Sequence, residues 1–418
     1  MKDSGIEWIG EIPEGWRTIN PKALFTQRKD KAQKGERQLT SSQQYGILYQ
    51  DDYMELTGSK VVTVEKDFDI LKHVEAGDFV ISMRSFQGGL EYSTKPGAIS
   101  SAYIMLVPNL ELVYPRFYRW LLKSSVYIDA LQRTTNMVRD GQAMRYSNFA
   151  QVRLFTLPLD EQKSRADFLD LECSSIDKIL FKTRSSIEEY KKLKQAVITQ
   201  AVTKGVRGER EMKDSGVEWI GEIPKEWDIL NLVAHTSMLT PMRDRPENLD
   251  GPIPWIRIED FDGKYISSSK ASLGVSKETV RSMNLKIYPV GTILCTSSCI
   301  MGKCAIVSRE LVSNQRFIGI IPDQNTCENF LYYLMLSNSE RMNYLATGAL
   351  QANLSRSSFE HLKVQFPSYQ EQKEISDYLD TKCAEIDKLI AKKEQLVKEL
   401  ESYKKSLIYE VVTGKREV

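Results

Sequence analysis

The clearest pattern along the chain is a repeat of apolar positions every 3.5 residues, and it occurs twice. Residues 161–203 contain no proline or glycine and are rich in residues that favour helices, so a single helix is expected there. Its apolar seam is Leu169, Cys173, Ile176, Leu180, Thr183, Ile187, Tyr190, Lys194, Val197 and Ala201. At 1.5 Å per residue such a helix would be about 64 Å long.

The same pattern returns at residues 371–413, where 16 of 43 positions are identical at an offset of 210. Because 210 is thirty heptads, the second seam keeps the register: Leu379, Cys383, Ile386, Ile390, Lys393, Val397, Leu400, Lys404, Leu407 and Val411. A seam this narrow is typical of helices that pair, which predicts an antiparallel two-helix coiled coil between the copies. Two separate amphipathic helices, each packed on its own domain, are the alternative.

The repeat extends to the rest of the chain. Residues 1–16 and 212–227 match at 13 of 16 positions, and Gly77–Pro108 aligns with Gly291–Pro322 at an offset of 214. The repeat predicts two units of about 210 residues. By symmetry, residue 1 is expected near the end of the second long helix.

The parts between these anchors combine short strand-like and helix-like runs. Strands are expected at Lys60–Val64, Asp78–Met83, Ser101–Pro108, Pro254–Ile258, Thr292–Thr296 and Phe317–Pro322, and helices at Pro115–Arg133 and Glu328–Ala346. The predicted fold class is α+β, with two mixed globular domains related by a pseudo-twofold axis and separated by the coiled coil. The predicted boundaries are 1–157 and 208–366 for the globular domains, and 158–207 and 367–418 for the helical arms.

Composition excludes several classes of protein. Lys plus Arg is 57 against 56 for Asp plus Glu, which excludes a histone-like polycation but allows a local basic patch. No export signal or apolar stretch near 18 residues is present, so a cytoplasmic location with reduced cysteines and no membrane association is expected.

The sequence contains no recognisable catalytic motif. The chain has no phosphate-binding loop, no Asn/Asp-Pro-Pro-aromatic tetrapeptide and no glycine-rich S-adenosylmethionine loop. Its three histidines are unpaired, and Cys295, Cys299 and Cys304 lack the spacing of a zinc site. The sequence therefore predicts no catalytic residues and no metal site.

Polar loops on the globular parts carry side chains that can read base edges through paired donors and acceptors. The candidates for DNA contact are Arg84, Ser85, Gln87 and Arg145 in the first domain and Arg257, Ser298, Asn314, Gln315 and Arg356 in the second. Simple solvation of each polar loop is the alternative.

The chain carries the duplicated MKDSG-(I/V)-EWIGEIP openings, the paired Pro-x-x-(x)-Glu-Gln-Lys segments at Pro158–Lys163 and Pro367–Lys373, and the arms that follow them. In these features it resembles the specificity subunits of type I restriction–modification systems. The resemblance covers essentially the whole chain. It implies a non-catalytic subunit that recognises a split sequence in double-stranded DNA, with one domain for each half-site and the arms as a ruler for the spacer.

The same resemblance implies partners and cofactors. Two methyltransferase (M) subunits would bind the arms, and two restriction (R) subunits would join where the system includes them. S-adenosylmethionine would then belong to the M subunit, ATP and Mg to the R subunit, and no cofactor to this chain. The alternatives are a coiled-coil adaptor that binds only proteins and a metal-dependent nuclease.

Overall fold

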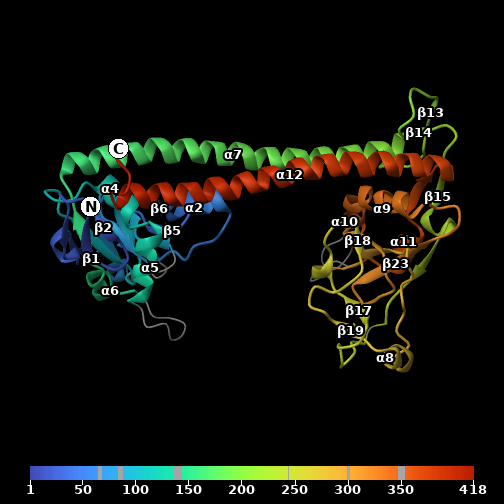
Figure 1. The fold of residues 1–418 in the computed structure, drawn as a ribbon, viewed down its shortest axis with the longest axis horizontal. Helices are drawn as coiled ribbons and strands as arrows, with labels where there is room; N and C mark the ends of the chain where they lie inside the picture. The colour runs from blue at the N-terminus through green and yellow to red at the C-terminus, as the bar shows by residue number, and fades with distance from the viewer. Residues whose placement is uncertain (65–67, 83–87, 135–143, 243, 299–301, 347–353) are drawn as a thin grey trace. The chain divides into compact units, whose positions relative to one another are not determined.

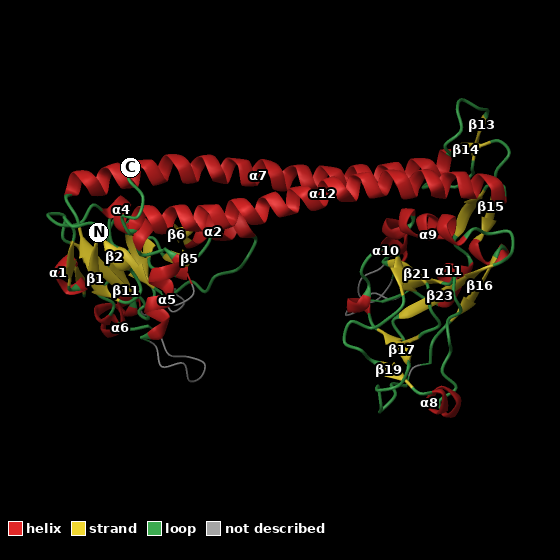
Figure 2. Ribbon diagram, in the orientation of Figure 1, coloured by secondary structure: helices red, strands yellow, loops and turns green. Residues whose placement is uncertain are grey.

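The fold is α+β, and the computed structural model describes residues 1–64, 68–82, 88–134, 144–242, 244–298, 302–346 and 354–418 (Figures 1 and 2). Two compact units are present. Unit 1 comprises Met1–Arg184 with Gln395–Val418, and unit 2 comprises Ser185–Glu394. Each unit therefore contains part of both long helices, α7 (Leu159–Lys204) and α12 (Tyr369–Val412).

The remaining elements of unit 1 are β1 (Lys2–Ile6), β2 (Gly10–Ile12), β3 (Arg17–Ile19), α1 (Pro21–Leu24), β4 (Phe25–Arg28), β5 (Leu39–Ser42), β6 (Gly46–Tyr49), α2 (Gln50–Thr57), the 3₁₀ turn Phe68–Ile70, β7 (Lys72–Val74), β8 (Phe79–Ile81), β9 (Glu91–Tyr92), β10 (Gly97–Ile99), β11 (Ile104–Pro108), α4 (Pro115–Leu121), α5 (Ser125–Arg133), α6 (Tyr146–Gln151) and β12 (Leu154–Thr156).

The remaining elements of unit 2 are β13 (Met212–Asp214), β14 (Glu222–Pro224), β15 (Asp228–Asn231), the 3₁₀ turn Leu232–Ala234, β16 (Thr236–Leu239), β17 (Ile253–Ile256), the 3₁₀ turn Ile258–Asp260, β18 (Tyr265–Ile266), β19 (Gly274–Val275), α8 (Lys277–Ser282), β20 (Ile293–Thr296), β21 (Cys304–Val307), β22 (Val312–Ser313), β23 (Phe317–Pro322), α9 (Glu328–Ser337), α10 (Ser339–Leu345), α11 (Arg356–Glu360) and β24 (Lys363–Phe366).

The two units share one sheet topology. The main sheet of unit 1 has the strand order β4-β11-β8-β9, and that of unit 2 begins with the equivalent order β16-β23-β20-β21 and adds β18. In both, the repeated opening forms a hairpin, β1-β2 or β13-β14. The units differ in what is inserted between these elements: unit 1 carries the β5-β6 hairpin, and unit 2 carries the β19-β17-β22 sheet. The duplication therefore preserved the framework while the insertions diverged.

Each unit has its own core, and the long helices take part in both. In unit 1, Leu169, Ile176 and Leu180 of α7 and Leu407 and Val411 of α12 belong to the same buried cluster as the strands and α4. In unit 2, the equivalent cluster includes Ile198 and Val202 of α7 with Ile375 and Leu379 of α12. Apolar burial thus joins the helices to each globular part as well as to each other.

The long helices run antiparallel within each unit, which Figure 1 shows as α7 beside α12. In unit 1, Lys404 Nζ lies 2.6 and 2.7 Å from the two carboxylate oxygens of Asp177. In unit 2, the equivalent Lys194 lies 2.7 Å from both oxygens of Asp387. The interpretation of two helices packed only on their own domains is therefore wrong.

The seam residues are buried or half-buried in both helices. Those that are buried are Leu169, Cys173, Ile176, Leu180, Thr183, Ile187, Ala201, Leu379, Cys383, Ile386, Leu407 and Val411. Those that are half-buried are Tyr190, Lys194, Val197, Ile390, Lys393, Val397, Leu400 and Lys404. Glycines end both helices: Gly205 and Gly414 have φ of 76° and 75°, which is the left-handed conformation that closes a helix C-terminus.

The Gln of each Glu-Gln-Lys segment binds the N-terminus of an earlier helix of the same globular part, α4 or α9. Gln162 accepts a hydrogen bond from the backbone N–H of Tyr114, at the N-terminus of α4, at 2.7 Å. Gln372 does the same for the N–H of Cys327, at the N-terminus of α9, at 2.8 Å. Both amides are buried, so these bonds satisfy backbone groups that water cannot reach.

The chain ends of unit 1 lie together, as the repeat predicted. Lys415 Nζ donates to the carbonyl of Ile9 at 3.1 Å. A Cβ added to Gly414 would lie 2.5 Å from the ring of Pro13, so the backbone passes directly over that ring.

Three of the predicted elements differ from the structure. Lys60–Val64 is not a strand; Val64 is instead held by both its backbone groups to the side-chain amide of Gln38, at 2.8 and 2.9 Å. The segment Pro115–Arg133 is two helices, because Ser124 accepts a bond from Tyr127 N–H and starts α5 anew. The segment Glu328–Ala346 likewise divides into α9 and α10 around Asn338.

No helix within the described ranges is both long and apolar enough to cross a membrane.

Candidate nucleic-acid interface

The candidate interface of unit 2 lies at one end of the strands of its main sheet, where β16 and β20 end and β23 begins. Residue pairing places the end of β20 beside the start of β23, with Thr296 opposite Phe317. The end of β16 lies beside the same strand, with Leu239 opposite Gly319. The polar residues that follow these strand ends are therefore brought together, although they are far apart in the sequence.

A hollow of about 300 Å³ opens at this end of the sheet and is lined by Thr240, Pro241, Ser297, Gln315, Phe317, Ile318, Leu354 and Arg356. Two of the predicted contact residues, Gln315 and Arg356, line it. Arg356 is the first residue of α11, and its Nε donates to Glu360 one turn later at 2.6 Å. An amide and a guanidinium beside an apolar floor can supply the paired donors and acceptors that base edges require.

Arg257 and Asn314 lie next to each other, where two strands end in parallel. Ile256 of β17 pairs with Ser313 of β22, so the residues that follow each strand emerge together. The Nη1 of Arg257 contacts Glu259 at 3.0 Å, whereas its Nε is buried without a hydrogen-bond partner within the described part of the chain. Asn314 is engaged locally, since its side-chain oxygen accepts from Arg316 N–H at 3.0 Å.

Ser298 is buried, with 6% of its surface exposed, so its side chain is not presented at the surface of unit 2. Conversely, Thr240 and Ser297 line the hollow and were not among the candidates. Each directly follows a strand of the main sheet, and that position after an apolar run was the available signal.

In unit 1 the equivalent end of the sheet is where β8 ends beside the start of β11, with Ile81 opposite Ile104. Arg84, Ser85 and Gln87 follow that strand end and lie outside the described residues. Arg145 is described: it is exposed and directly precedes α6, as Ser355 directly precedes α11 in unit 2. Its backbone N–H donates to Asn148 at 3.0 Å.

Two buried carboxylates of unit 1, Asp78 before β8 and Glu91 of β9, each have a cation. Arg28 donates to both oxygens of Asp78, at 2.7 and 3.0 Å, and this bond raises the pKa of Arg28. Lys123 Nζ lies 2.7 and 2.9 Å from the oxygens of Glu91; burial nevertheless raises the pKa of Glu91 above its ordinary value. Their negative charges are thus compensated internally, which limits repulsion of a phosphate backbone.

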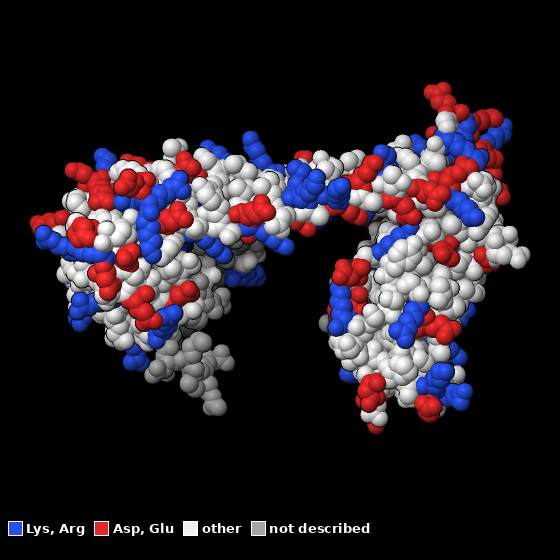
Figure 3. Space-filling model, viewed as in Figure 1, with Lys and Arg blue, Asp and Glu red and all other residues white. Residues whose placement is uncertain are grey.

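Charge is mixed over the molecular surface. Figure 3 shows Lys and Arg interspersed with Asp and Glu on both units in this view. No group of three or more His, Cys, Asp or Glu side chains could hold a metal ion within the described ranges.

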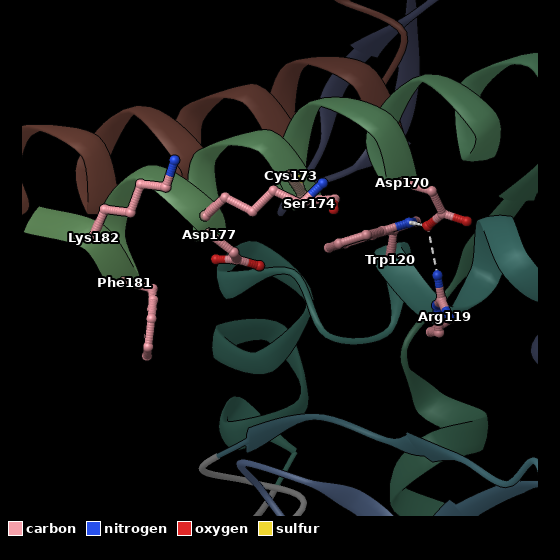
Figure 4. A pocket seen from close by; sticks show the side chains of 9 residues that line it. Arg119, Trp120, Asp170, Cys173, Ser174, Asp177, Phe181 and Lys182 are labelled. Carbon is pink, nitrogen blue, oxygen red and sulfur yellow. Dashed lines mark hydrogen bonds and ion pairs between the residues drawn. The ribbon is translucent and has the colours of Figure 1, made fainter. Parts of the chain in front are cut away.

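A second hollow, of about 620 Å³, lies in unit 1 where α7 meets α4 (Figure 4). Its walls are Arg119, Trp120, Asp170, Cys173, Ser174, Asp177, Lys178, Phe181 and Lys182. Asp170 anchors one side: Arg119 Nη2 and Trp120 Nε1 donate to its Oδ1 at 2.5 and 2.7 Å.

Burial alone would raise the pKa of Asp170. Hydrogen bonds from Arg116 and Trp120 outweigh this effect, and the pKa of Asp170 is lowered. Burial raises the pKa of Cys173 to about 11, so that thiol stays protonated at neutral pH. Phe181 is 74% exposed and points away from its helix, which makes it a large apolar group without cover within unit 1. We call the surface formed by Trp120, Lys178, Phe181 and Lys182 the aromatic-lysine face.

The comparisons with known proteins agree with this geometry. Residues 228–399 match the family model described as "Type I restriction modification DNA specificity domain". The MjaIX specificity subunit of Methanocaldococcus jannaschii is 34% identical over 181 residues, which cover 41% of this chain and 41% of that subunit. The putative MjaX specificity subunit of the same organism is 24% identical over 97% of this chain and 95% of its own length.

Two solved structures share the fold. One, from work on "complex assembly and conformational transition of the type I R-M system", has a TM-score of 0.74 at 12% identity and covers 97% of this chain and all of its own, 100%. The HsdS subunit of Thermoanaerobacter tengcongensis has a TM-score of 0.54 at 13% identity, over 97% of this chain and 98% of its own.

The chain therefore shares its two-unit fold with these solved structures over 97% of its length. Residues 228–399 thus match a DNA specificity domain of type I restriction–modification systems, and the chain as a whole is similar to specificity subunits of those systems.

Proposed function

We propose that this chain recognises a bipartite DNA target without catalysing any reaction itself, with unit 1 reading one half-site and unit 2 the other. The observation that carries the proposal is the repetition of one sheet order in both units with different polar residues at the same end of the sheet. A preserved sheet framework with different polar residues in the two units suits two different half-sites. A duplicated protein-binding surface would instead keep similar contact residues in both units.

In unit 2 we assign base reading to Gln315 and Arg356, which line one hollow, and to Arg257 with Asn314 at the neighbouring strand ends. Thr240 and Ser297 join them as residues of the same lining. In unit 1 the assignment stays with Arg84, Ser85, Gln87 and Arg145. Affinity for the phosphate backbone comes in large part from partner subunits, because this chain is nearly neutral, with a net charge of +1.

The paired helices are proposed to act as a ruler. A helix of 46 residues, such as α7, is about 69 Å long at 1.5 Å per residue. Reading heads on one face of B-DNA need centres about 34–36 Å apart or a multiple of that distance. The apolar seam and the ion pairs Asp177–Lys404 and Lys194–Asp387 stiffen the pair.

The helices are also proposed to recruit the catalytic subunits. Two M subunits would bind, one for each copy of the repeat, and two R subunits would join where the system includes them. In unit 1 the aromatic-lysine face offers an uncovered Phe181 beside Lys178 and Lys182, which suits an apolar partner segment with acidic flanks. S-adenosylmethionine would be bound by the M subunits, and ATP and Mg by the R subunits.

The experiment that tests the reading and ruler roles lengthens both helices by one heptad. Seven residues are inserted between Arg184 and Ser185 in α7 and between Glu394 and Gln395 in α12, where one unit ends and the other begins in both helices. The insertion preserves the seam register and adds about 10 Å to each helix. Methylated adenines are then mapped across the genome of cells carrying either chain with its partner subunits.

We expect both half-sites to stay the same while the accepted spacer changes. An unchanged spacer would contradict the ruler. If methylation does not depend on this chain, and the complex binds a target duplex no better than scrambled duplexes in gel-shift competition, the chain is an adaptor that binds only proteins.

A further inference from the structure

Two cysteines face each other across adjacent strands in unit 2. Cys295 of β20 pairs with Cys304 of β21 in an antiparallel register, and the two Sγ atoms are 2.7 Å apart. Neither cysteine has a role in the proposed function. Unit 1 has no such pair, because the equivalent positions at the offset of 214 are Ile81 and Leu90.

The backbone hydrogen bonds between β20 and β21 show whether Cys295 and Cys304 form a hydrogen-bonded or a non-hydrogen-bonded pair. Thr296 N–H donates to the carbonyl of Lys303 at 2.9 Å, and Val307 N–H donates to that of Thr292 at 2.9 Å. Hydrogen-bonded and non-hydrogen-bonded pairs alternate along an antiparallel ladder, so Cys295 and Cys304 form a non-hydrogen-bonded pair. The Cα atoms of such a pair are about 4.5 Å apart, which lies within the range that a disulfide spans.

The surroundings favour a bond between these two sulfurs over other reactions. Cys295 is fully buried and Cys304 is 5% exposed, so a bulky reagent cannot reach either thiol in the folded chain. Cys304 is the more exposed of the two, so a small oxidant such as a peroxide reaches its sulfur first. Burial raises the pKa of Cys295, so this thiol is protonated in the reduced pair and loses its proton only as it attacks the oxidised sulfur of Cys304.

We propose that Cys295 and Cys304 are a modification site at which a peroxide forms an intramolecular disulfide, and that this bond locks the end of β20 to the start of β21. The Cys304 thiolate attacks one peroxide oxygen, giving a sulfenic acid and releasing water or an alcohol after proton uptake. Cys295 then attacks the Cys304 sulfur, its proton leaves, and the sulfenic hydroxyl departs as water. In sum, two thiols and one peroxide give one disulfide and two molecules of water, or one of water and one of alcohol.

The consequence lies at the two strand ends that the bond joins. Ser297, which lines the hollow at the end of the sheet, directly follows β20, and Leu354 N–H donates to the carbonyl of Ser297 at 2.9 Å. A bond between these strand ends limits how far β20 and β21 can separate. The backbone amides of the two strands near the bond are therefore expected to exchange with solvent more slowly in the oxidised chain.

The test treats the full chain with hydrogen peroxide, quenches free thiols with an alkylating reagent under denaturing conditions, and maps disulfide-linked peptides by mass spectrometry. We expect a Cys295–Cys304 link, its reversal by a dithiol, and a thermal midpoint about 5 °C higher in the oxidised chain. Hydrogen exchange of the peptides that contain β20 and β21 should slow at least threefold, while peptides around Ile81 and Leu90 stay unchanged.

Three variants serve as controls. C295S and C304S should each abolish the link and the slowed exchange, whereas C299S should retain both. A link through Cys299, or over-oxidation of Cys304 without any link, would overturn the proposal. Because serine is close to cysteine in size, all three variants are expected to fold, and their reduced forms supply the baseline for exchange.

Discussion

The indole Nε1 of Trp16 donates to both carboxylate oxygens of Glu161, at 3.1 and 3.2 Å, and so ties the N-terminal repeat of unit 1 to the first turn of α7. Unit 2 repeats the contact, with Trp227 Nε1 donating to Glu371 at 3.0 Å. The identical tryptophans and glutamates of the two copies are therefore structural anchors.

In each unit an arginine also contacts the anchoring glutamate, but the two arginines come from non-equivalent positions in the repeat. In unit 1 it is Arg165, one turn along α7, which contacts Glu161 at 2.8 Å and covers the Trp16 ring. In unit 2 the equivalent helix position is Ile375, and Arg210 from beyond α7 takes the role, at 2.6 Å from Glu371. Each arginine also donates to a carbonyl near the C-terminus of a long helix: Arg165 to Val411 and Arg210 to Lys204.

Replacing Glu161 by alanine should therefore destabilise unit 1. Trp16 Nε1 would lose its acceptor, and Arg165, whose side chain is only 6% exposed, would lose its carboxylate. We expect a loss of about 2 kcal/mol, because a buried donor and a buried charge are left unpaired. Thermal unfolding of the full chain measures it, as a fall of about 4–8 °C in the midpoint of the unit 1 transition.

Asp160→Ala is the matched control, since Asp160 is an exposed acid in the same helical turn. Equal midpoints for Glu161→Ala and Asp160→Ala would show that the anchor contributes nothing to stability.

The ion pair Asp177–Lys404 should contribute a small coupling energy to the helix pair. Its partners are 56% and 24% exposed, so solvent screens the attraction. A double-mutant cycle with Asp177→Asn and Lys404→Met should give about 0.5 kcal/mol in urea unfolding, and less at high salt. The equivalent cycle on Lys194 and Asp387 in unit 2 provides an internal repeat, and zero coupling in both at low salt would refute the role of these pairs.

Gln315→Ala and Arg356→Ala should affect recognition of the second half-site alone. Each removes a group that can bond a base edge, for which a loss of about tenfold in discrimination is expected. Binding of the assembled complex to duplexes with single substitutions in either half-site provides the measurement. Lys225→Ala, which changes an exposed cation of the β14 hairpin paired with Glu211, is the control. Loss of discrimination at the first half-site instead would reverse the assignment of the units.

The same experiment applies to unit 1. Arg84→Ala and Gln87→Ala should relax discrimination at the first half-site by a similar factor and leave the second intact. If neither variant changes discrimination anywhere, base reading in unit 1 lies with other residues.

The repeated elements could be predicted from the sequence because the chain contains an internal duplication. Heptad spacing located the helices around Leu169 and Leu379, and alternating strands such as Phe317–Pro322 were found from their apolar runs. The break between α4 and α5 was missed because it depends on one serine cap, Ser124, within an otherwise helical run. The lining of the hollow in unit 2 was found only in part, since Thr240 and Gln315 are brought together by strand pairing that local sequence does not encode.

His73 should make the stability of unit 1 depend on pH. It lies between two carboxylates, with Nδ1 2.9 Å from Glu36 and Nε2 3.0 Å from Glu75. Burial opposes a charge on the ring, but the two hydrogen bonds outweigh it and raise the pKa of His73 above its ordinary value of 6.5. A raised pKa means that the folded chain holds the proton more tightly than the unfolded chain does.

The stabilisation from this proton is therefore complete below pH 6.5 and is lost as the pH rises through the raised pKa of the folded chain. Thermal midpoints of the wild-type chain and His73→Gln are compared between about pH 6 and about pH 8.5. The wild-type midpoint should fall more across this interval than that of the variant, which keeps a hydrogen-bonding side chain but cannot be charged. Parallel pH profiles for the two chains would show that folding leaves the pKa of His73 unchanged, and would contradict the prediction.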